Sequence, residues 1–202
     1  MIQSFFFSFA WPLFSIFQVD IMEVNALQMA TLSISFSIMT ILVINFGAKL
    51  SDRIGRTKLI FFNRLMLAAF PLSYIFATKI WHLYVIHFIV AGIIFIGSPS
   101  VQAYLLDIVP PREGGVYFGI HSMLTGVFMF LGSLAGGYLT GWFATWTPTL
   151  LIAVQISLGI AVVGRVLTSF LFLSLKEVKK FPSTWGEVRS QLLKRFRLEP
   201  PV

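Results

Sequence analysis

Six apolar runs, separated by short polar connections, fill the chain from its first residues to Leu175. They are Ile2–Val19, Leu27–Phe46, Leu59–Ala77, Ile80–Leu106, Val116–Phe143 and Thr149–Leu175. Each is long enough for a helix to cross a membrane, which takes about 17–25 residues. Because a backbone in lipid must satisfy its hydrogen bonds internally, the pattern predicts an all-α membrane protein with six transmembrane helices. The fourth and fifth runs are longer than a bilayer needs, so we expect them to tilt, to kink near Pro99 or to protrude.

Composition supports this interpretation. Hydrophobic residues make up 57% of the chain and charged residues 11%, which is too little polar surface to cover a soluble globule of 202 residues. The net charge of +7 does not indicate nucleic-acid binding, because the basic residues gather at the ends of apolar runs. The chain has no cysteine, which excludes disulfides and thiolate metal sites. We expect no cofactor and no bound metal.

The basic residues are unevenly divided between the two sides of the predicted bundle. Placing the connection between the second and third runs in the cytoplasm puts 13 of the 15 basic residues on that side. Lys79 lies on the other side and Arg165 within the sixth run. By the positive-inside rule, the chain is expected to be a multi-pass cell membrane protein with both termini in the cytoplasm. The cytoplasmic set is Lys49, Arg53, Arg56, Lys58, Arg64, Arg112, Lys176, Lys179, Lys180, Arg189, Lys194, Arg195 and Arg197.

The pattern divides the chain into a transmembrane bundle, residues 1–175, and a basic tail, residues 176–202. In the tail, Thr184 and Glu187 have the spacing of a helix capping box, and apolar residues recur every three or four positions among basic ones. This is typical of a helix lying on the inner leaflet. A partly ordered tail is the alternative.

The connection between the second and third runs contains the sequence Asp52-Arg53-Ile54-Gly55-Arg56. It resembles the Asp-Arg-x-Gly-Arg signature of the major facilitator superfamily of secondary transporters. The family has a glycine four residues before the aspartate, where this chain has Ala48, with Gly47 one residue earlier. Asp107-Ile108-Val109-Pro110 after the fourth run and glycines in the fifth run extend the resemblance over all six runs.

Members of this family typically have twelve spans in two six-span halves, so the resemblance implies one half of such a helical bundle. We expect the carboxy-terminal half. The first run starts directly after Met1, the segment Lys176–Val202 resembles a terminal tail, and His87 stands where amino-terminal halves often carry a buried arginine. The second half would then be a missing segment, another chain or a second copy of this one.

The resemblance implies that the polar segment from Gly47 to Lys58, expected to be a loop, is a latch that closes the cytoplasmic side. Asp52 can face the positive end of a neighbouring helix, and Arg53 or Arg56 can reach Asp107. In the alternative interpretation these charges set topology and keep a tight turn hydrated, which fits Lys49 and Lys58 best. The gating residues implied are Gly47, Asp52, Arg53, Gly55, Arg56 and Asp107.

The resemblance also implies a small-molecule substrate, with or without a coupling ion, in a central cavity. No acid lies in the middle of a run, so a carboxylate relay is not expected. The cavity candidates are His87 and Gln102 on the fourth run and His121 and Thr125 on the fifth. The alternative is that each histidine packs or lies at the interface.

Small residues in the fifth run predict close helix packing, since two backbones can approach where side chains are small. They are Gly126, Gly132, Gly136 and Gly137. Arg165 lies deep in the sixth run, some eleven residues before Lys176. A cation at that depth is a functional candidate by default, and pairing with a neighbouring helix or snorkelling is the alternative.

Three classes of function compete. The first is a secondary transporter, or half of one, that works by alternating access. The second is a truncated or non-transporting membrane subunit with the same fold, because one half cannot enclose a two-sided pathway. The third, an intramembrane hydrolase, is not expected: the sixth run contains no histidine, and no zinc-ligand spacing occurs.

Overall fold

The computed structural model describes residues 1–109 and 114–175, apart from the side chains of Ala48, Ser51, Asp52, Arg53 and Asp107. Within these residues, six helical stretches are long and apolar enough to span a membrane, and no strand occurs. The all-α, six-span prediction is confirmed. The predicted tail, residues 176–202, lies outside the described residues. The spans are Ile2–Ile21, Ala26–Gly47, Arg56–Ile75, Ile80–Leu106, Gly114–Ala144 and Leu150–Ser174.

The first span is interrupted. Helix α1 (Ile2–Phe9) meets α2 (Trp11–Ile16) at Ala10, and a π-helical turn, η1 (Phe17–Ile21), completes the span. Pro12 stands in the first turn of α2, a position where its missing N–H is tolerated. The interruption leaves the last carbonyls of α1 without partners inside their own helix.

The third span is interrupted as well. Helix α4 (Arg56–Met66) and α5 (Ala69–Ile75) are separated by Leu67 and Ala68. Pro71, in the first turn of α5, follows Leu67 by four residues, so it cannot donate the usual helix hydrogen bond to the carbonyl of Leu67. Both interrupted spans therefore contain backbone carbonyls that other side chains can use.

The predicted loop between Gly47 and Lys58 is wrong as secondary structure. Helix α3 (Ala26–Ile54) continues through the polar residues, Gly55 alone interrupts it, and α4 begins at Arg56. An α-helix satisfies its own backbone wherever it lies, so the polar composition marks the edge of the membrane and not the end of the helix.

The remaining spans are longer and more regular. Helix α6 (Ile80–Ile108) stays helical through Pro99, and α7 (Gly114–Ala144) follows. The sixth span comprises α8 (Leu150–Ser169) and a 3-10 turn, η2 (Phe170–Ser174). The hydroxyl of Thr149 caps α8 by accepting a hydrogen bond from the Ile152 N–H at 3.4 Å.

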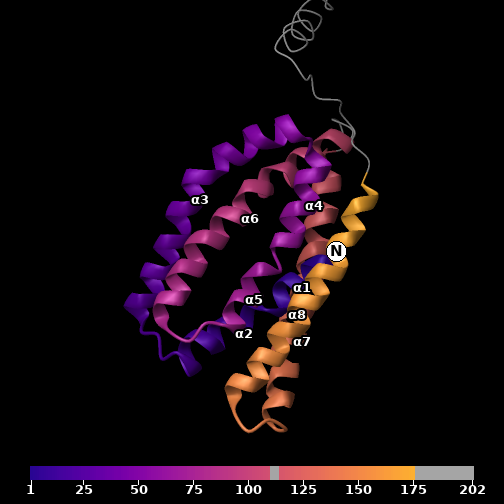
Figure 1. Ribbon diagram of the computed structural model, residues 1–202. Helices are drawn as coiled ribbons and strands as arrows, with labels where there is room; N and C mark the ends of the chain where they lie inside the picture. Colours follow the sequence, from indigo (N-terminus) through magenta and orange to yellow (C-terminus); the bar gives the residue numbers. More distant parts are fainter. Residues whose placement is uncertain (110–113, 176–202) are drawn as a thin grey trace, which may run out of the picture.

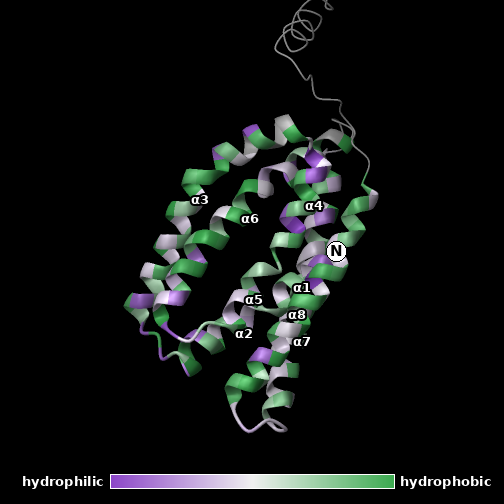
Figure 2. Ribbon diagram, viewed as in Figure 1, coloured by the Kyte–Doolittle hydropathy of each residue, from purple (hydrophilic) through white to green (hydrophobic). Residues whose placement is uncertain are grey.

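The spans pack in pairs. Helix α3 lies along α6, while α1 packs against α7 and α8 (Figure 1). Apolar residues cover most of the helices (Figure 2). Burial is uneven, since 6% of the residues in the apolar stretch of α3 and of α7 are buried within the described chain, against 33–39% in the other four spans. These two helices therefore offer most of their surface to lipid or to a partner.

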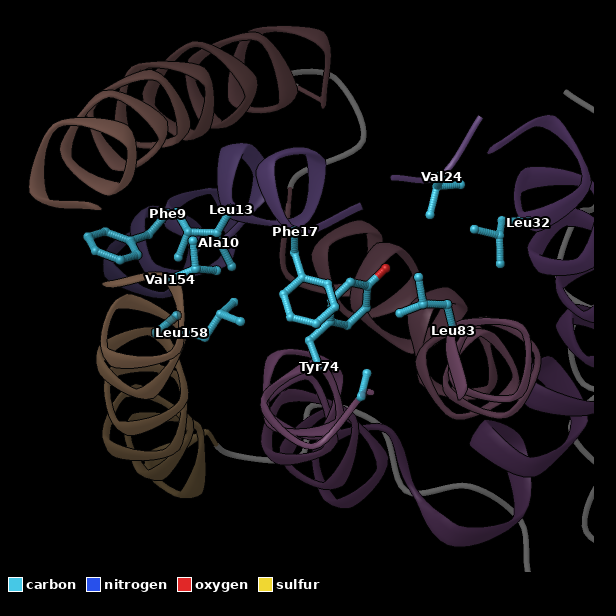
Figure 3. Close-up of a cluster of buried hydrophobic side chains, with 12 residues drawn as sticks. Phe9, Ala10, Leu13, Phe17, Val24, Leu32, Tyr74, Leu83, Val154 and Leu158 are labelled. Atoms are coloured by element: carbon cyan, nitrogen blue, oxygen red, sulfur yellow. The ribbon is translucent and has the colours of Figure 1, made fainter. Parts of the chain in front are cut away.

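The hydrophobic core joins the first, third and sixth spans. Phe9 and Leu13 lie against Val154 and Leu158 of α8 (Figure 3). Further along, the Phe17 ring packs on the Tyr74 ring with their centroids 5.4 Å apart. This core fixes the interrupted spans relative to α8, so it also positions the polar groups described next.

Candidate functional site

Helices α3 and α4 are joined by one residue, Gly55, and we call this junction the hinge. Gly55 has φ 99° and ψ 146°, a backbone conformation that is essentially restricted to glycine. Any other residue there would be strained, so the backbone conformation explains why the signature has glycine at this position. The chain reverses direction at this residue, and Arg56 follows as the first residue of α4.

Arg56 ties the hinge to α6. Its Nη1 donates a hydrogen bond to the carbonyl of Ala103 at 2.8 Å. Ala103 lies one helical turn before Asp107, so the guanidinium lies near the end of α6. On the other side of the hinge, a Cβ on Gly47 would collide with the carbonyl oxygen of Ile96. Gly47 therefore allows close contact between α3 and α6.

The charged side chains of the predicted latch are only partly placed. Those of Asp52, Arg53 and Asp107 lie outside the described residues, although their backbones belong to α3 and α6. The latch itself thus stays a prediction. The structure supplies its frame, in which Gly55 and Arg56 link α3, α4 and α6.

A polar cavity of about 280 Å³ lies between α1, α4 and α6. Gln102, one of the predicted cavity residues, lines it, and Asn63 crosses from α4 to donate its amide to the carbonyl of Ile94 at 2.7 Å. The cavity wall comprises Gln3, Ser4, Phe7, Asn63, Arg64, Leu67, Ile94, Phe95, Ser98, Val101 and Gln102.

Three polar residues of this wall, Gln3, Asn63 and Arg64, have roles that the sequence analysis missed. Arg64 counted there as a determinant of orientation only. A usable signal exists, because Arg64 lies five residues into the predicted run Leu59–Ala77, where a cation needs a partner. Gln3 and Asn63 carry no comparable signal, since their importance depends on which spans pack together.

His87 belongs to a separate network. Gln18 donates its amide to the Tyr74 hydroxyl at 2.7 Å, and that hydroxyl lies 3.0 Å from His87 Nε2. The rings of Phe36 and Phe70 pack around the imidazole. His87 is not among the residues lining the 280 Å³ cavity, and a role for it in substrate binding stays a prediction.

The two candidates on α7 lie apart from both groups. His121 and Thr125 are half-buried and do not line the cavity beside Gln102. Thr125 Oγ1 approaches Met1 Sδ at 3.7 Å, a weak contact. The structure thus does not bring the four predicted cavity residues together, and a role for His121 and Thr125 in substrate binding stays a prediction.

Arg165 is enclosed by backbone carbonyls of the interrupted spans. Its Nε donates to Phe6 at 3.2 Å, its Nη2 to Phe7 at 2.8 Å and its Nη1 to Leu67 at 2.6 Å. The guanidinium carbon also lies 5.2 Å from the centre of the Phe7 ring. Arg165 thus pairs with neighbouring helices, one of the alternatives that the sequence left open, and joins the first, third and sixth spans.

The glycines of α7 fall into two pairs. A Cβ on Gly132 or Gly136 would collide with the carbonyl oxygen of Phe5 or Phe9, so these two glycines let α1 and α7 touch. A Cβ on Gly126 or Gly137 would meet nothing within 4 Å. Packing within the described chain does not require a glycine at that second pair.

Comparison with known proteins agrees with this geometry. The sequence profile of the Major Facilitator Superfamily matches residues 1–202. A curated relative, the tetracycline resistance protein, class H, of Pasteurella multocida, is 32% identical over 91 residues. The aligned part covers 45% of this chain and 22% of the relative. The chain thus matches only about a fifth of that relative's length.

The family match covers the whole chain, and the six spans and the glycine hinge are in place. The chain is an integral, multi-pass membrane protein. It belongs to the major facilitator superfamily.

Proposed function

We propose that this chain is one six-span half of a secondary transporter that moves a small solute across the cell membrane by alternating access. The observation that carries the proposal is the hinge, in which Gly55 adopts a glycine-only conformation and Arg56 is hydrogen-bonded to α6. In this proposal both termini lie in the cytoplasm, which the gathering of basic residues on that side supports. The hinge then lies on the cytoplasmic side.

A second six-span unit completes the pathway. Helices α3 and α7 support this step, because 6% of the residues in the apolar stretch of each are buried within the described chain, which leaves a long face for a partner. In the closed state, Asp52 of α3 faces the positive end of a helix in that unit, and Arg56 holds the hinge against α6. Breaking these contacts lets the two units rock apart on the cytoplasmic side.

The test is the accessibility of the polar cavity from the cytoplasm. The chain has no cysteine, so Ser98→Cys places a single thiol in the cavity wall. Asp52→Asn is expected to raise its labelling by a membrane-impermeant maleimide applied from the cytoplasmic side. A loss of about 1.4 kcal/mol from the closed state multiplies a minor open population about tenfold.

Lys49→Gln is the matched control, because it removes one charge from the same segment without touching the signature. Its labelling is expected to equal that of the parent. Equal labelling of Asp52→Asn and the parent, or equal increases in both variants, would contradict the latch.

The competing function is a membrane subunit that keeps the fold but transports nothing. The molar mass of the purified chain in detergent tests one form of the transporter, a pair of identical six-span units in one particle. A dimer that moves a solute in vesicles supports transport, and a dimer that moves none favours the non-transporting subunit. Tetracycline is the first solute to test, since the curated relative is named for resistance to it.

A further inference from the structure

Arg64 is a cation inside a membrane span whose charge is not matched by the described residues. It lies in α4, and the two acids whose side chains the structure describes, Asp20 and Glu23, are at the opposite end of the first span. Its guanidinium carbon lies 5.5 Å from the centre of the Phe172 ring. Its Nε is buried and has no hydrogen-bond partner in the described structure. This leaves a donor and a positive charge to be satisfied.

Gln3 is an unmatched acceptor beside it. The side chain is 5% exposed, and its Nε2 donates to the backbone carbonyl of Arg64 at 3.2 Å. The bond from the amide nitrogen fixes the orientation of the group. Its Oε1, which can only accept, is buried without a partner among the described residues. An unmatched donor and an unmatched acceptor thus lie together on adjacent spans.

Gln3 stands between a polar cavity and an apolar groove, with Arg64 beside it on the cavity side. Gln3 and Arg64 both line the 280 Å³ cavity, where Ser4, Ser98 and Gln102 add further polar groups. Gln3 also lines a second hollow of about 300 Å³, between α1 and the end of the sixth span. Phe172, which packs on Arg64, belongs to this groove. Its walls are Met1, Ile2, Gln3, Thr168, Leu171, Phe172 and Leu175.

We propose that this composite site binds one anionic phospholipid with a hydroxylated headgroup, such as phosphatidylglycerol, from the leaflet at which the chain begins. The phosphate accepts hydrogen bonds from Arg64, a headgroup hydroxyl donates to Gln3 Oε1, and an acyl chain lies in the apolar groove. The anionic charge matches the cation, and the hydroxyl matches the acceptor, which a phosphate alone would leave unsatisfied. The groove selects a lipid over a soluble anion, because it offers apolar surface next to the charge.

The experiment measures lipid retained by the purified 202-residue chain in native mass spectrometry. The probes are dioleoyl phosphatidylglycerol, phosphatidylmethanol and phosphatidylcholine, each at equal concentration; phosphatidylmethanol is an anionic phosphodiester without a headgroup hydroxyl. Phosphatidylglycerol is expected to bind at least about tenfold more tightly than phosphatidylcholine, because the choline cation offsets the charge of the phosphate and choline offers no headgroup hydroxyl to Gln3. Arg64→Gln should remove this preference, and Arg64→Lys should retain part of it.

Two controls separate the site from general charge. Lys58→Gln removes a cation from the exposed face of the same helix and should leave the preference unchanged. Gln3→Leu should reduce the affinity for phosphatidylglycerol to that for phosphatidylmethanol, because it removes the acceptor for the headgroup hydroxyl. Size-exclusion profiles and helical circular dichroism equal to those of the parent establish that each variant is folded.

Several outcomes would overturn the proposal. One is an Arg64→Gln variant that keeps the preference, and another is a Lys58→Gln variant that loses it equally. A third is displacement of phosphatidylglycerol by glycerol 3-phosphate at millimolar concentration, which would identify a soluble anion as the ligand. The proposal does not rest on transport, so its failure leaves the latch experiment unaffected.

Discussion

Arg165 and Arg64 are both cations within membrane spans, and their surroundings differ completely. Arg165 is 1% exposed and donates to three backbone carbonyls, of Phe6, Phe7 and Leu67. Arg64 packs on one aromatic ring and has a buried Nε without a partner in the described structure. The donors of Arg165 find acceptors within the chain. Arg64 has a donor left for a bound ligand, which we propose is a phospholipid.

The difference comes from the interrupted helices. Leu67 precedes Pro71 by four residues, so its carbonyl lacks the N–H that a regular helix would supply. Phe6 and Phe7 are among the last four residues of α1, whose carbonyls also lack helix partners. Arg165 can satisfy both breaks at once with its planar fork of donors. A buried arginine is therefore structural where broken helices supply acceptors, and a binding candidate where they do not.

The largest expected effect is the loss of the Arg165 clamp. Arg165→Leu leaves carbonyls of two spans unsatisfied in the membrane interior, and we expect the free energy of unfolding to fall by about 3 kcal/mol or more. Unfolding in mixed detergent and SDS micelles, followed by tryptophan fluorescence, measures it. Arg165→Lys should be intermediate, because one ammonium cannot reach all three carbonyls. An unchanged free energy for Arg165→Leu would mean that the clamp contributes nothing.

A second change disturbs α1 from its other face while Arg165 stays intact. Gly132→Ala places a methyl group against the carbonyl of Phe5, and the forced separation of α1 from α7 is expected to cost about 2 kcal/mol. Gly137→Ala, five residues along the same helix, meets open space and should change the free energy by less than about 0.5 kcal/mol. The same SDS titration measures both. Equal losses in the two variants would show that contact with α1 does not decide the result, since the gain in helix propensity from Gly to Ala is the same at both positions.

A third change tests why the Leu67 carbonyl needs Arg165. Pro71→Ala restores a backbone N–H four residues after Leu67, so in the Arg165→Leu background it should recover about 1 kcal/mol. In the parent, where Arg165 already donates to that carbonyl at 2.6 Å, the same change should recover less. A double-mutant cycle of unfolding free energies gives the coupling. Pro99→Ala is the control. Pro99 lies within α6, which is not interrupted, so this change should show no coupling to Arg165. Coupling of equal size for the two prolines would refute the proposed origin of the clamp.

Hydropathy predicts the six spans because lipid imposes one simple requirement, a long apolar stretch with internal hydrogen bonds. It does not predict helix ends. Helix α3 passes through Lys49 and stops at Gly55, where backbone conformation and not polarity ends it. The signature identifies Gly55 and Arg56 through the family resemblance, and the structure gives their physical reasons.

The surroundings of the two arginines could not be predicted from the sequence. Depth along a run is sufficient to make Arg165 unusual, but its acceptors come from spans far away in the chain, at Phe6 and Leu67. Arg64 lies close enough to the basic segment to pass as a determinant of orientation. The sequence contains the proline that frees a carbonyl, but the partner that uses it depends on helix packing.

The smallest expected effect on stability is the loss of Arg64. Its guanidinium makes one cation–π contact with Phe172, so Arg64→Gln in lipid-free detergent should change the free energy of unfolding by less than about 1 kcal/mol. With phosphatidylglycerol added, the parent should gain stability in proportion to the logarithm of lipid concentration, whereas the variant should not. The SDS titration repeated over a series of lipid concentrations measures both slopes. If Arg64→Gln instead loses as much stability without lipid as Arg165→Leu does, Arg64 is a second clamp, and the distinction between the two arginines fails.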